Sequence, residues 1–316
     1  MCLLWIRSKI AATRNFPSKG ILPDDNALAK AVKYDRAVIL GVDGAGDYFS
    51  KCDVPNFKRI FASGAVTYTA RSQWPTISAE NWTAVLHAVP FQLHKTTNQI
   101  AAARAFTNEA YPSVFKVYGE RHPDLVTASI INWYPINKGI VEDDIPGNYK
   151  INAGEFYKGP NDDEAVDRTA VEKILEFIED KDPKILYTHL DGPDHGGHQH
   201  GYGSEGYVKS VINVDKLLGV IYDAYCKKGW GDNTLFVLIT DHGHVNKNGH
   251  GGHGGWTESE RNVTLAVAGG LGNIIHGEIG SAGTVDVSSI VLYGLGEKQP
   301  DSWWGRVPKG IFNTLE

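Results

Sequence analysis

The sequence predicts an α/β fold in which a mostly parallel central sheet is flanked by helices on both faces. Short apolar runs of strand length, such as residues 235–239 (LFVLI), alternate with longer segments that have helical periodicity. These runs are apolar at almost every position, which is typical of strands buried on both faces of a parallel sheet. Several of them lead into acidic residues, and α/β folds carry their sites at the carboxyl ends of such strands.

The first strand is expected at Arg36–Asp43 (RAVILGVD), because this run is apolar and ends on an acid. We expect residues 1–34 to form a lead-in segment and residues 35–316 to form a single domain. Pro55–Ser63 has a proline at its start and predicts a short helix. Ala65–Ala70 predicts a second strand.

A further helix is expected within Trp74–Val89, with the hydroxyl of Thr76 or Ser78 as its N-cap. The N–H groups and positive dipole end of a helix start favour an anionic ligand and an ionised hydroxyl. An ordinary N-cap is the alternative interpretation of these hydroxyls.

The pattern weakens at residues 91–160, where we expect a small, loop-rich, cap-like insertion over the site. Val126–Ile131 is a candidate strand within it, whereas Asn132–Gly159 is loop-rich and aromatic. The remaining elements alternate as expected for a parallel sheet covered by helices. They are Asp163–Asp180 (helix), Lys184–Leu190 (strand), Tyr207–Lys227 (helix), residues 235–239 (strand), Asn262–Ala268 (strand) and Thr284–Leu295 (helix).

Composition excludes several functional classes. The net charge of −6 leaves no basic footprint for a nucleic-acid backbone, so we expect no specific nucleic-acid binding. No apolar run is long enough to span a bilayer, and the apolar patch at Cys2–Ile6 is too short for a good signal-peptide core. Cys2, Cys52 and Cys226 are too widely spaced for a disulfide framework. These features favour a cytoplasmic, reducing compartment without fixing it, and they leave the oligomeric state open.

Histidine is concentrated in two short windows. Eight of the 12 histidines lie within His189–His200 and His242–His253, and each window follows an apolar run and contains acidic residues. Imidazole and carboxylate groups together suit zinc and similar transition metals. A His/Gly-rich surface loop is the alternative, but two such clusters at two strand ends favour a metal site.

Five short motifs follow one another along the chain. They are a strand ending in Asp43, PTISAEN at 75–81, PDHGGH at 193–198, TDHG at 240–243 and HGGWTESER at 253–261. In this order and spacing the chain resembles the alkaline phosphatase superfamily, most closely its nucleotide pyrophosphatase/phosphodiesterase branch. The resemblance covers about residues 36–312 and implies an alkaline phosphatase-like fold.

The resemblance also implies a two-metal hydrolase of phosphate esters, most closely a phosphodiesterase or nucleotide pyrophosphatase. Ser78 is implied as the nucleophile that forms a phosphoseryl-type intermediate, and Asn81 as the group that stabilises a phosphoryl oxygen. The implied metal ligands are Asp194, His198 and His253 for one ion, and Asp43, Asp241 and His242 for the other. The ligand types favour Zn²⁺, while Mn²⁺ or iron would accept the same set. The expected substrate is a small phosphate ester or nucleotide-like molecule.

Two assignments keep alternatives. His250 competes with His253, because residues 249–252 (GHGG) also contain H-G-G, but the T-x-x-E-R continuation favours His253. The surplus polar groups near the ligands are expected to surround them or to face solvent. These groups are Asp191, His195, His200 and His244.

Other activities remain alternatives to a phosphodiesterase. A phosphomonoesterase, or a metal-dependent phosphomutase, would need a cationic clamp for a dianionic phosphate. Arg71, Lys95 and Arg104 are the only nearby candidates, and none is compelling. The alternative from another class is a non-catalytic metal-binding relative, against which the retention of every ligand type and of the hydroxyl argues.

Overall fold

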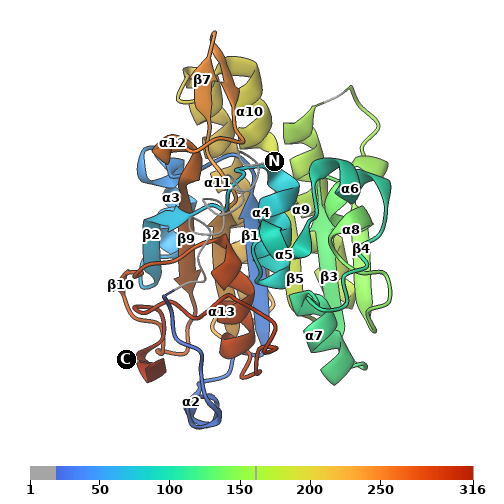
Figure 1. The fold of residues 1–316 in the computed structure, drawn as a ribbon, viewed down its shortest axis with the longest axis vertical. Helices are drawn as coiled ribbons and strands as arrows, with labels where there is room; N and C mark the ends of the chain where they lie inside the picture. The colour runs from blue at the N-terminus through green and yellow to red at the C-terminus, as the bar shows by residue number, and fades with distance from the viewer. Residues whose placement is uncertain (1–18, 161, 316) are drawn as a thin grey trace, which may run out of the picture.

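An eight-stranded, mostly parallel sheet runs through the computed structural model, which describes residues 19–160 and 162–315 (Figure 1). The order of strands across the sheet is β10-β2-β9-β6-β1-β5-β3-β4. The strands are β1 (Arg36–Val42), β2 (Ala65–Arg71), β3 (Val126–Ile131), β4 (Asn148–Asn152), β5 (Pro183–Leu190), β6 (Thr234–Thr240), β9 (Asn262–Ala268) and β10 (Gly277–Glu278). Strand β9 runs antiparallel to both of its neighbours, and the other neighbouring pairs are parallel. The predicted fold class is therefore confirmed.

Strand β1 shows why the apolar runs became the interior of the sheet. All of its residues are buried. Val38 and Leu40 belong to the hydrophobic core on one face, whereas Ala37 and Ile39 belong to the core on the other. Because successive side chains of a strand point to opposite faces, a run that is apolar at every position can be buried only between two layers.

Helices supply both layers. The helices that pack on one face are α4 (Ser78–His87), α7 (Val114–Arg121), α8 (Pro135–Gly139) and α13 (Val287–Gly294). Those on the other face are α3 (Pro55–Ile60), α9 (Asp163–Asp180) and α11 (Glu205–Lys227). The other α-helices of the described residues are α2 (Asp25–Lys30), α5 (Phe91–His94), α6 (Asn98–Ala103), α10 (Gly192–His200) and α12 (Glu258–Arg261).

Residues 91–160 are more regular than the sequence pattern indicated. β3 and β4 from this segment extend the central sheet, and β3 pairs in parallel with both β4 and β5. The sequence did not predict β4, because this edge strand (NYKIN) is polar and only partly buried, so it lacks the all-apolar signature of the central strands. The loop-rich expectation for residues 132–159 was therefore wrong for α8 and β4.

The lead-in also has structure where it is described. Ile21 pairs with Val307, and Asp24 caps helix α2 by accepting a hydrogen bond from the N–H of Ala27. Residues 1–18, which include the patch at Cys2–Ile6, lie outside the described residues.

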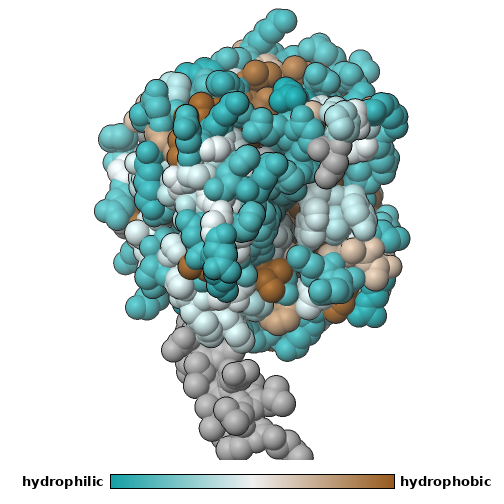
Figure 2. All heavy atoms as spheres, turned by 90° about the horizontal axis from the view of Figure 1, so that it is seen from above, coloured by the Kyte–Doolittle hydropathy of each residue, from teal (hydrophilic) through white to brown (hydrophobic). Residues whose placement is uncertain are grey.

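Across residues 19–160 and 162–315, no helix is long and apolar enough to cross a membrane. The face shown in Figure 2 is mainly hydrophilic, with hydrophobic side chains in small separate groups.

The register of the three central strands brings their carboxyl ends to one edge. Val42 at the end of β1 lies opposite Leu190 of β5 and Thr240 of β6. The residue that follows is an aspartate in all three strands. Above this edge, α10 packs against the hairpin of β7 (Val245–Lys247) and β8 (His250–Gly252), at the top of Figure 1.

Candidate metal centre and nucleophile

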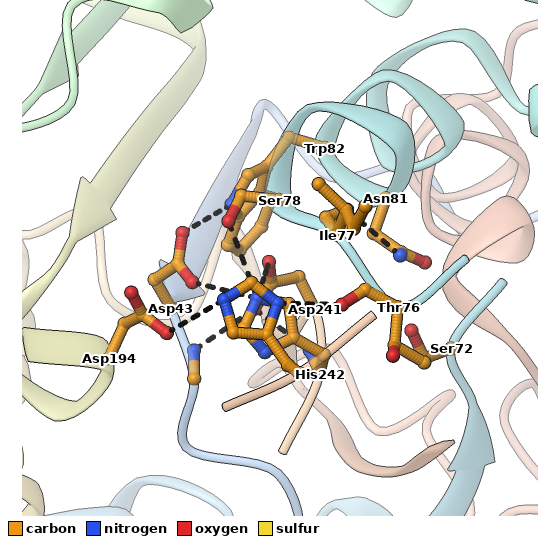
Figure 3. A network of polar contacts seen from close by, with 12 residues as sticks. Asp43, Ser72, Thr76, Ile77, Ser78, Asn81, Trp82, Asp194, Asp241 and His242 are labelled. Atoms are coloured by element: carbon orange, nitrogen blue, oxygen red, sulfur yellow. Dashed lines mark hydrogen bonds and ion pairs between the residues drawn. The ribbon is translucent and has the colours of Figure 1, made fainter. Parts of the chain in front are cut away.

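Three carboxylates from different elements meet at this edge. Asp43 follows β1, Asp241 follows β6, and Asp194 lies in the first turn of α10. Asp43 and Asp241 are buried, and Asp194 is half-buried. Figure 3 shows Asp43 and Asp241 beside the ring of His242, with Asp194 next to Asp43.

The Asp43 carboxylate is held by two ring donors. Its Oδ2 accepts hydrogen bonds from Trp82 Nε1 (2.8 Å) and from His189 Nε2 (2.9 Å). Burial and the charge of Asp194 raise the pKa of Asp43, but the His189 hydrogen bond and the nearby imidazoles outweigh them and lower it. Asp43 is therefore kept ionised, with one oxygen fixed.

The Asp241 carboxylate is held by the backbone instead. Its Oδ1 accepts from the N–H groups of Gly44 (3.1 Å) and His242 (2.8 Å). Gly44 has φ +65°, in the left-handed region that favours glycine, so the sharp turn after β1 aims its N–H at Asp241.

The remaining oxygens of the cluster accept no hydrogen bond from the described residues and face imidazole nitrogens. Within the described part of the chain, Asp43 Oδ1, Asp241 Oδ2 and Asp194 Oδ1 are buried and make no hydrogen bond. Buried polar atoms are normally hydrogen-bonded, so three carboxylate oxygens without a hydrogen bond at one point indicate a site for a cation.

Two histidines present nitrogen to Asp194. His198 Nε2 lies 3.4 Å from Asp194 Oδ2, and its Nδ1 lies 2.9 Å from the carbonyl oxygen of Gly251. His253 Nε2 lies 3.7 Å from Asp194 Oδ1, and its Nδ1 lies 2.7 Å from the carbonyl oxygen of Thr76. A carbonyl can only accept, so Nδ1 carries the proton when the ring is neutral and Nε2 is left as a metal ligand.

His242 joins the other two carboxylates. Its Nε2 lies 3.4 Å from Asp43 Oδ1 and 3.3 Å from Asp241 Oδ2. Burial, together with the neighbouring His253 imidazole, lowers the pKa of His242 to about 3. The ring is therefore neutral at neutral pH, which is the form that binds a metal.

These distances fit a metal coordination shell. Zinc bonds nitrogen and oxygen at about 2.0–2.2 Å, so tetrahedral ligand atoms lie about 3.3–3.6 Å apart. We call Asp43, Asp241 and His242 the Asp43 position, and Asp194, His198 and His253 the Asp194 position. The structure thus brings the six predicted ligands into one cluster. Groups whose ligand atoms lie within 4.8 Å of one another include Asp194/His242/His253, Asp194/His198/His244 and Asp43/Asp241/His242.

The other histidines and the other aspartate near the cluster differ in where they lie. His250 is exposed, with its Nδ1 on the His198 carbonyl oxygen at 3.1 Å, so His253 and not His250 reaches Asp194. His195 pairs with Asp163, and His200 is exposed. Asp191 lies beside Asp43 and His189, and His244 is fully buried near Asp194.

Repulsion between the buried carboxylates favours the binding of a cation at this cluster. Burial, followed by the charge of Asp43, raises the pKa of Asp241 well above its ordinary value. The same two causes raise the pKa of Asp191. A divalent cation would remove both the repulsion and the desolvation penalty, so the donor set, the open oxygens and the charge balance all fit metal ions.

The predicted nucleophile lies at this cluster. Ser78 is the first residue of α4, and its Oγ lies 3.3 Å from His242 Nε2. The expectation that Thr76 or Ser78 caps the helix was wrong, because Ile77 is the N-cap residue and makes no side-chain cap. Thr76 Oγ1 instead accepts from the N–H of Gly254 (2.8 Å), which ties the start of α4 to the loop that carries His253.

Asn81 has a different position from the one predicted. It is fully buried, and its Oδ1 accepts from the N–H of Gln73 (2.7 Å). Its Nδ2 donates to the carbonyl oxygens of Pro75 (3.2 Å) and Ile77 (3.1 Å). Both ends of the amide are used inside the protein, so the structure makes Asn81 a brace for the loop before Ser78 and not a phosphoryl contact.

Sequence reasoning missed Asn98, which lies beside Ser78, the predicted nucleophile. Asn98 Oδ1 accepts the N–H of Ala79, the residue after Ser78, at 2.9 Å. This bond holds an amide group next to the serine from a different helix, α6. The sequence contained no local signal for it, because 20 residues separate Asn98 from Ser78.

Sequence reasoning also missed the two donors that hold Asp43. Trp82 crosses β1 at Gly41, where a Cβ would lie 2.9 Å from the Trp82 ring. His189 lies opposite Gly41 in the register of β1 and β5. A glycine inside an apolar strand marks a close approach, and this was the available signal.

Glu80, in the first turn of helix α4 after Ser78, allows the effect of burial on a carboxyl group to be tested. Its side chain is 3% exposed, Oε2 makes no hydrogen bond within the described residues, and burial raises its pKa from 4.5 to about 7. The folded state therefore holds a proton that the unfolded state has lost between these pH values, so stability falls as pH rises through this window. We expect Glu80→Gln to stabilise the metal-free protein by about 1 kcal/mol at pH 5 and about 3 kcal/mol at pH 8.

Urea unfolding in EDTA at the two pH values would measure this difference. Glu258→Gln is the control, because Glu258 is exposed and pairs with Arg71 at the surface. A Glu80→Gln gain that did not change with pH would contradict the raised pKa.

The fold is an α/β architecture of the alkaline phosphatase type, and clusters of Asp and His that could hold metal ions lie at the carboxyl edge of its sheet. Residues 37–274 match the family model described as type I phosphodiesterase / nucleotide pyrophosphatase. The chain belongs to this family.

Solved structures with this fold include murine ectonucleotide pyrophosphatase/phosphodiesterase 5. It has a TM-score of 0.64 at 13% identity, over 85% of this chain and 96% of that one. The lipoteichoic acid synthase LtaP from Listeria monocytogenes has a TM-score of 0.62 at 14% identity, over 94% and 80% of the two chains. At these identities the likeness shows the fold alone.

Curated relatives include transferases. GPI ethanolamine phosphate transferase 2 of Aspergillus fumigatus is 25% identical over 279 residues, which are 83% of this chain and 34% of the relative. Ectonucleotide pyrophosphatase/phosphodiesterase family member 1 of Mus musculus is 32% identical over 74 residues, or 23% and 8% of the two chains. The chain thus spans about a third of the length of the transferase that it matches.

Proposed function

We propose that this protein cleaves phosphate diesters, such as nucleotide derivatives, by transferring the phosphoryl group first to Ser78 and then to water. The observation that carries the proposal is the position of Ser78 Oγ, 3.3 Å from His242 Nε2. A serine hydroxyl at the start of a helix, beside a metal-type ligand and unpaired carboxylate oxygens, has the surroundings that activate a nucleophile.

In the first step Ser78 Oγ bonds to phosphorus as the alcohol leaving group departs. In the second step water attacks the phosphoseryl group, the Ser78 ester bond breaks, and the serine is restored. Divalent ions at the Asp43 and Asp194 positions would neutralise charge on phosphorus and lower the pKa of the hydroxyl, with Zn²⁺ favoured by the ligands.

The side-chain amides of Asn98 and Asn81 have different roles in positioning the substrate and Ser78. Asn98, held by the N–H of Ala79, donates from its amide nitrogen to a non-bridging phosphoryl oxygen. Asn81 keeps the loop from Gln73 to Ile77 in place, so that Ser78 is presented at a fixed distance from His242.

The cations near the site support a diester over a monoester. The Arg71 guanidinium binds the Glu258 carboxylate at 2.6 and 3.0 Å, so its charge is already paired. Lys95 and Arg104 are exposed. A diester carries one negative charge where a monoester carries two, so it needs less cationic compensation from side chains.

A second candidate differs only in the acceptor. The relatives named GPI ethanolamine phosphate transferases support transfer of the phosphoryl group from Ser78 to an alcohol instead of water. The Ser78 step is the same in both reactions, and the protein's environment around the acceptor decides between them.

Turnover of bis(p-nitrophenyl) phosphate and of p-nitrophenyl phosphate tests the proposal. We expect the diester to react faster, and we expect EDTA to abolish the reaction and Zn²⁺ to restore it, because the cluster needs cations. A faster reaction of the monoester would favour a phosphatase or mutase. A new diester formed when glycerol is added, identified by mass spectrometry, would favour the transferase. Protein purified without chelator that held no metal would favour a non-catalytic relative.

A further inference from the structure

One buried imidazole beside the metal ligands has no role in the set assigned so far. His244 is fully buried, and neither of its ring nitrogens makes a hydrogen bond to any of the residues described. A polar ring in the interior that makes no hydrogen bond costs free energy, and a bound cation would remove that cost.

The ring is aimed at the Asp194 position. His244 Nε2 lies 3.1 Å from Asp194 Oδ1, the same unpaired oxygen that His253 approaches. Ligand atoms of Asp194, His198 and His244 all lie within 4.8 Å of one another. The 3.1 Å separation is close to that of two atoms bound to one ion, about 3.3 Å apart.

The backbone forms a slot around this ring. A Cβ at Gly44 or at Gly197 would lie 2.7 Å from His244 Nε2, and a Cβ at Gly251 would lie 3.0 Å from its Nδ1. The turn after β1, helix α10 and strand β8 thus each have glycine where they meet His244. The ring is thereby confined with Nε2 facing Asp194, as a preorganised ligand needs to be.

We propose that His244 is a nitrogen ligand of the ion at the Asp194 position, in addition to Asp194, His198 and His253. The inference rests on the proposed function, because it requires that the cluster binds metal. One carboxylate and three imidazoles form a nitrogen-rich set that favours Zn²⁺ over Mg²⁺ or Mn²⁺. Four protein ligands would hold Zn²⁺ more tightly here than the three of the Asp43 position, and zinc can add a fifth ligand from the substrate.

Two substitutions separate this role from a merely positioning one. His244→Leu removes the nitrogen and fills the slot, whereas His244→Gln keeps an N–H near the place of Nε2 but is a poor zinc ligand. The control is His250→Leu, because His250 is exposed and lies outside the cluster. The measurements are the Zn²⁺ dissociation constants by chelator competition and the visible absorption spectrum of the Co²⁺-loaded protein.

We expect both His244 variants to weaken the tighter Zn²⁺ site by more than about 100-fold, which exceeds the usual effect of residues that only orient a ligand. We also expect both to alter the Co²⁺ spectrum, and His250→Leu to match the wild type. A normal Co²⁺ spectrum with affinity restored in His244→Gln would overturn the proposal, as would unchanged Zn²⁺ affinity in His244→Leu. Wild-type protein that bound no Zn²⁺ would instead overturn the proposed function as well.

Discussion

Replacing Ser78 by alanine is expected to lower turnover of the preferred diester by at least about 10³-fold while the protein keeps its metal ions. The reason is that the hydroxyl is proposed to form the covalent intermediate, and loss of a nucleophile removes a step that the rest of the site cannot replace. Ser78 Oγ contacts His242 but supplies none of the anionic oxygens of the cluster, so its loss leaves the cation site intact.

Steady-state kinetics with metal analysis of the same samples would measure this effect. Ser78→Thr keeps a hydroxyl at the same position and is expected to retain most of the activity. Ser259→Ala is the control for a neutral serine change, because Ser259 is exposed on helix α12. Near-normal turnover in Ser78→Ala with both ions bound would exclude Ser78 as the nucleophile.

The sheet could be predicted from the sequence because its central strands have a simple signature. β1, β5 and β6 are buried on both faces, so their sequences are apolar and end where the polar edge begins. β4 lacks that signature, since an edge strand needs only a partly buried face and its sequence is polar. The order of the strands depends on pairings between distant segments, and local pattern does not contain it.

The meeting of the predicted ligands at one edge could be predicted for a related reason. Each predicted ligand lies directly after a strand or in α10, the helix that follows β5, so spacing along the chain placed it at this edge. Asn81 was assigned to a phosphoryl group, but its amide is satisfied by the Gln73–Ile77 backbone, a contact that sequence does not reveal. Asn98 and His244 were not assigned as functional, because tertiary packing brings them to the site.

Asp241→Asn is expected to have opposite effects on the two states of the protein. In EDTA the variant should be more stable than the wild type, because burial and the charge of Asp43 oppose ionisation of Asp241. The amide keeps an oxygen that can accept from the N–H groups of Gly44 and His242, so the local backbone is preserved. With Zn²⁺ the order should reverse, because a ligand that binds only the folded state at 100 times its Kd stabilises it by about 2.7 kcal/mol. Asp241→Asn loses the stabilisation that Zn²⁺ binding at the Asp43 position gives the wild type.

Thermal unfolding with and without Zn²⁺, together with diester turnover, would reveal this crossover. We expect turnover to fall by more than about 100-fold, since a lost ligand should cost more than a residue that only orients one. Asp191→Asn is the matched control, because burial and Asp43 also raise the pKa of Asp191, yet Asp191 is not an assigned ligand. It should stabilise the metal-free protein in the same direction and still gain stability from Zn²⁺. If Asp241→Asn gained as much from Zn²⁺ as Asp191→Asn did, Asp241 would not be a ligand, and the repulsion at this edge would have to be balanced by another group.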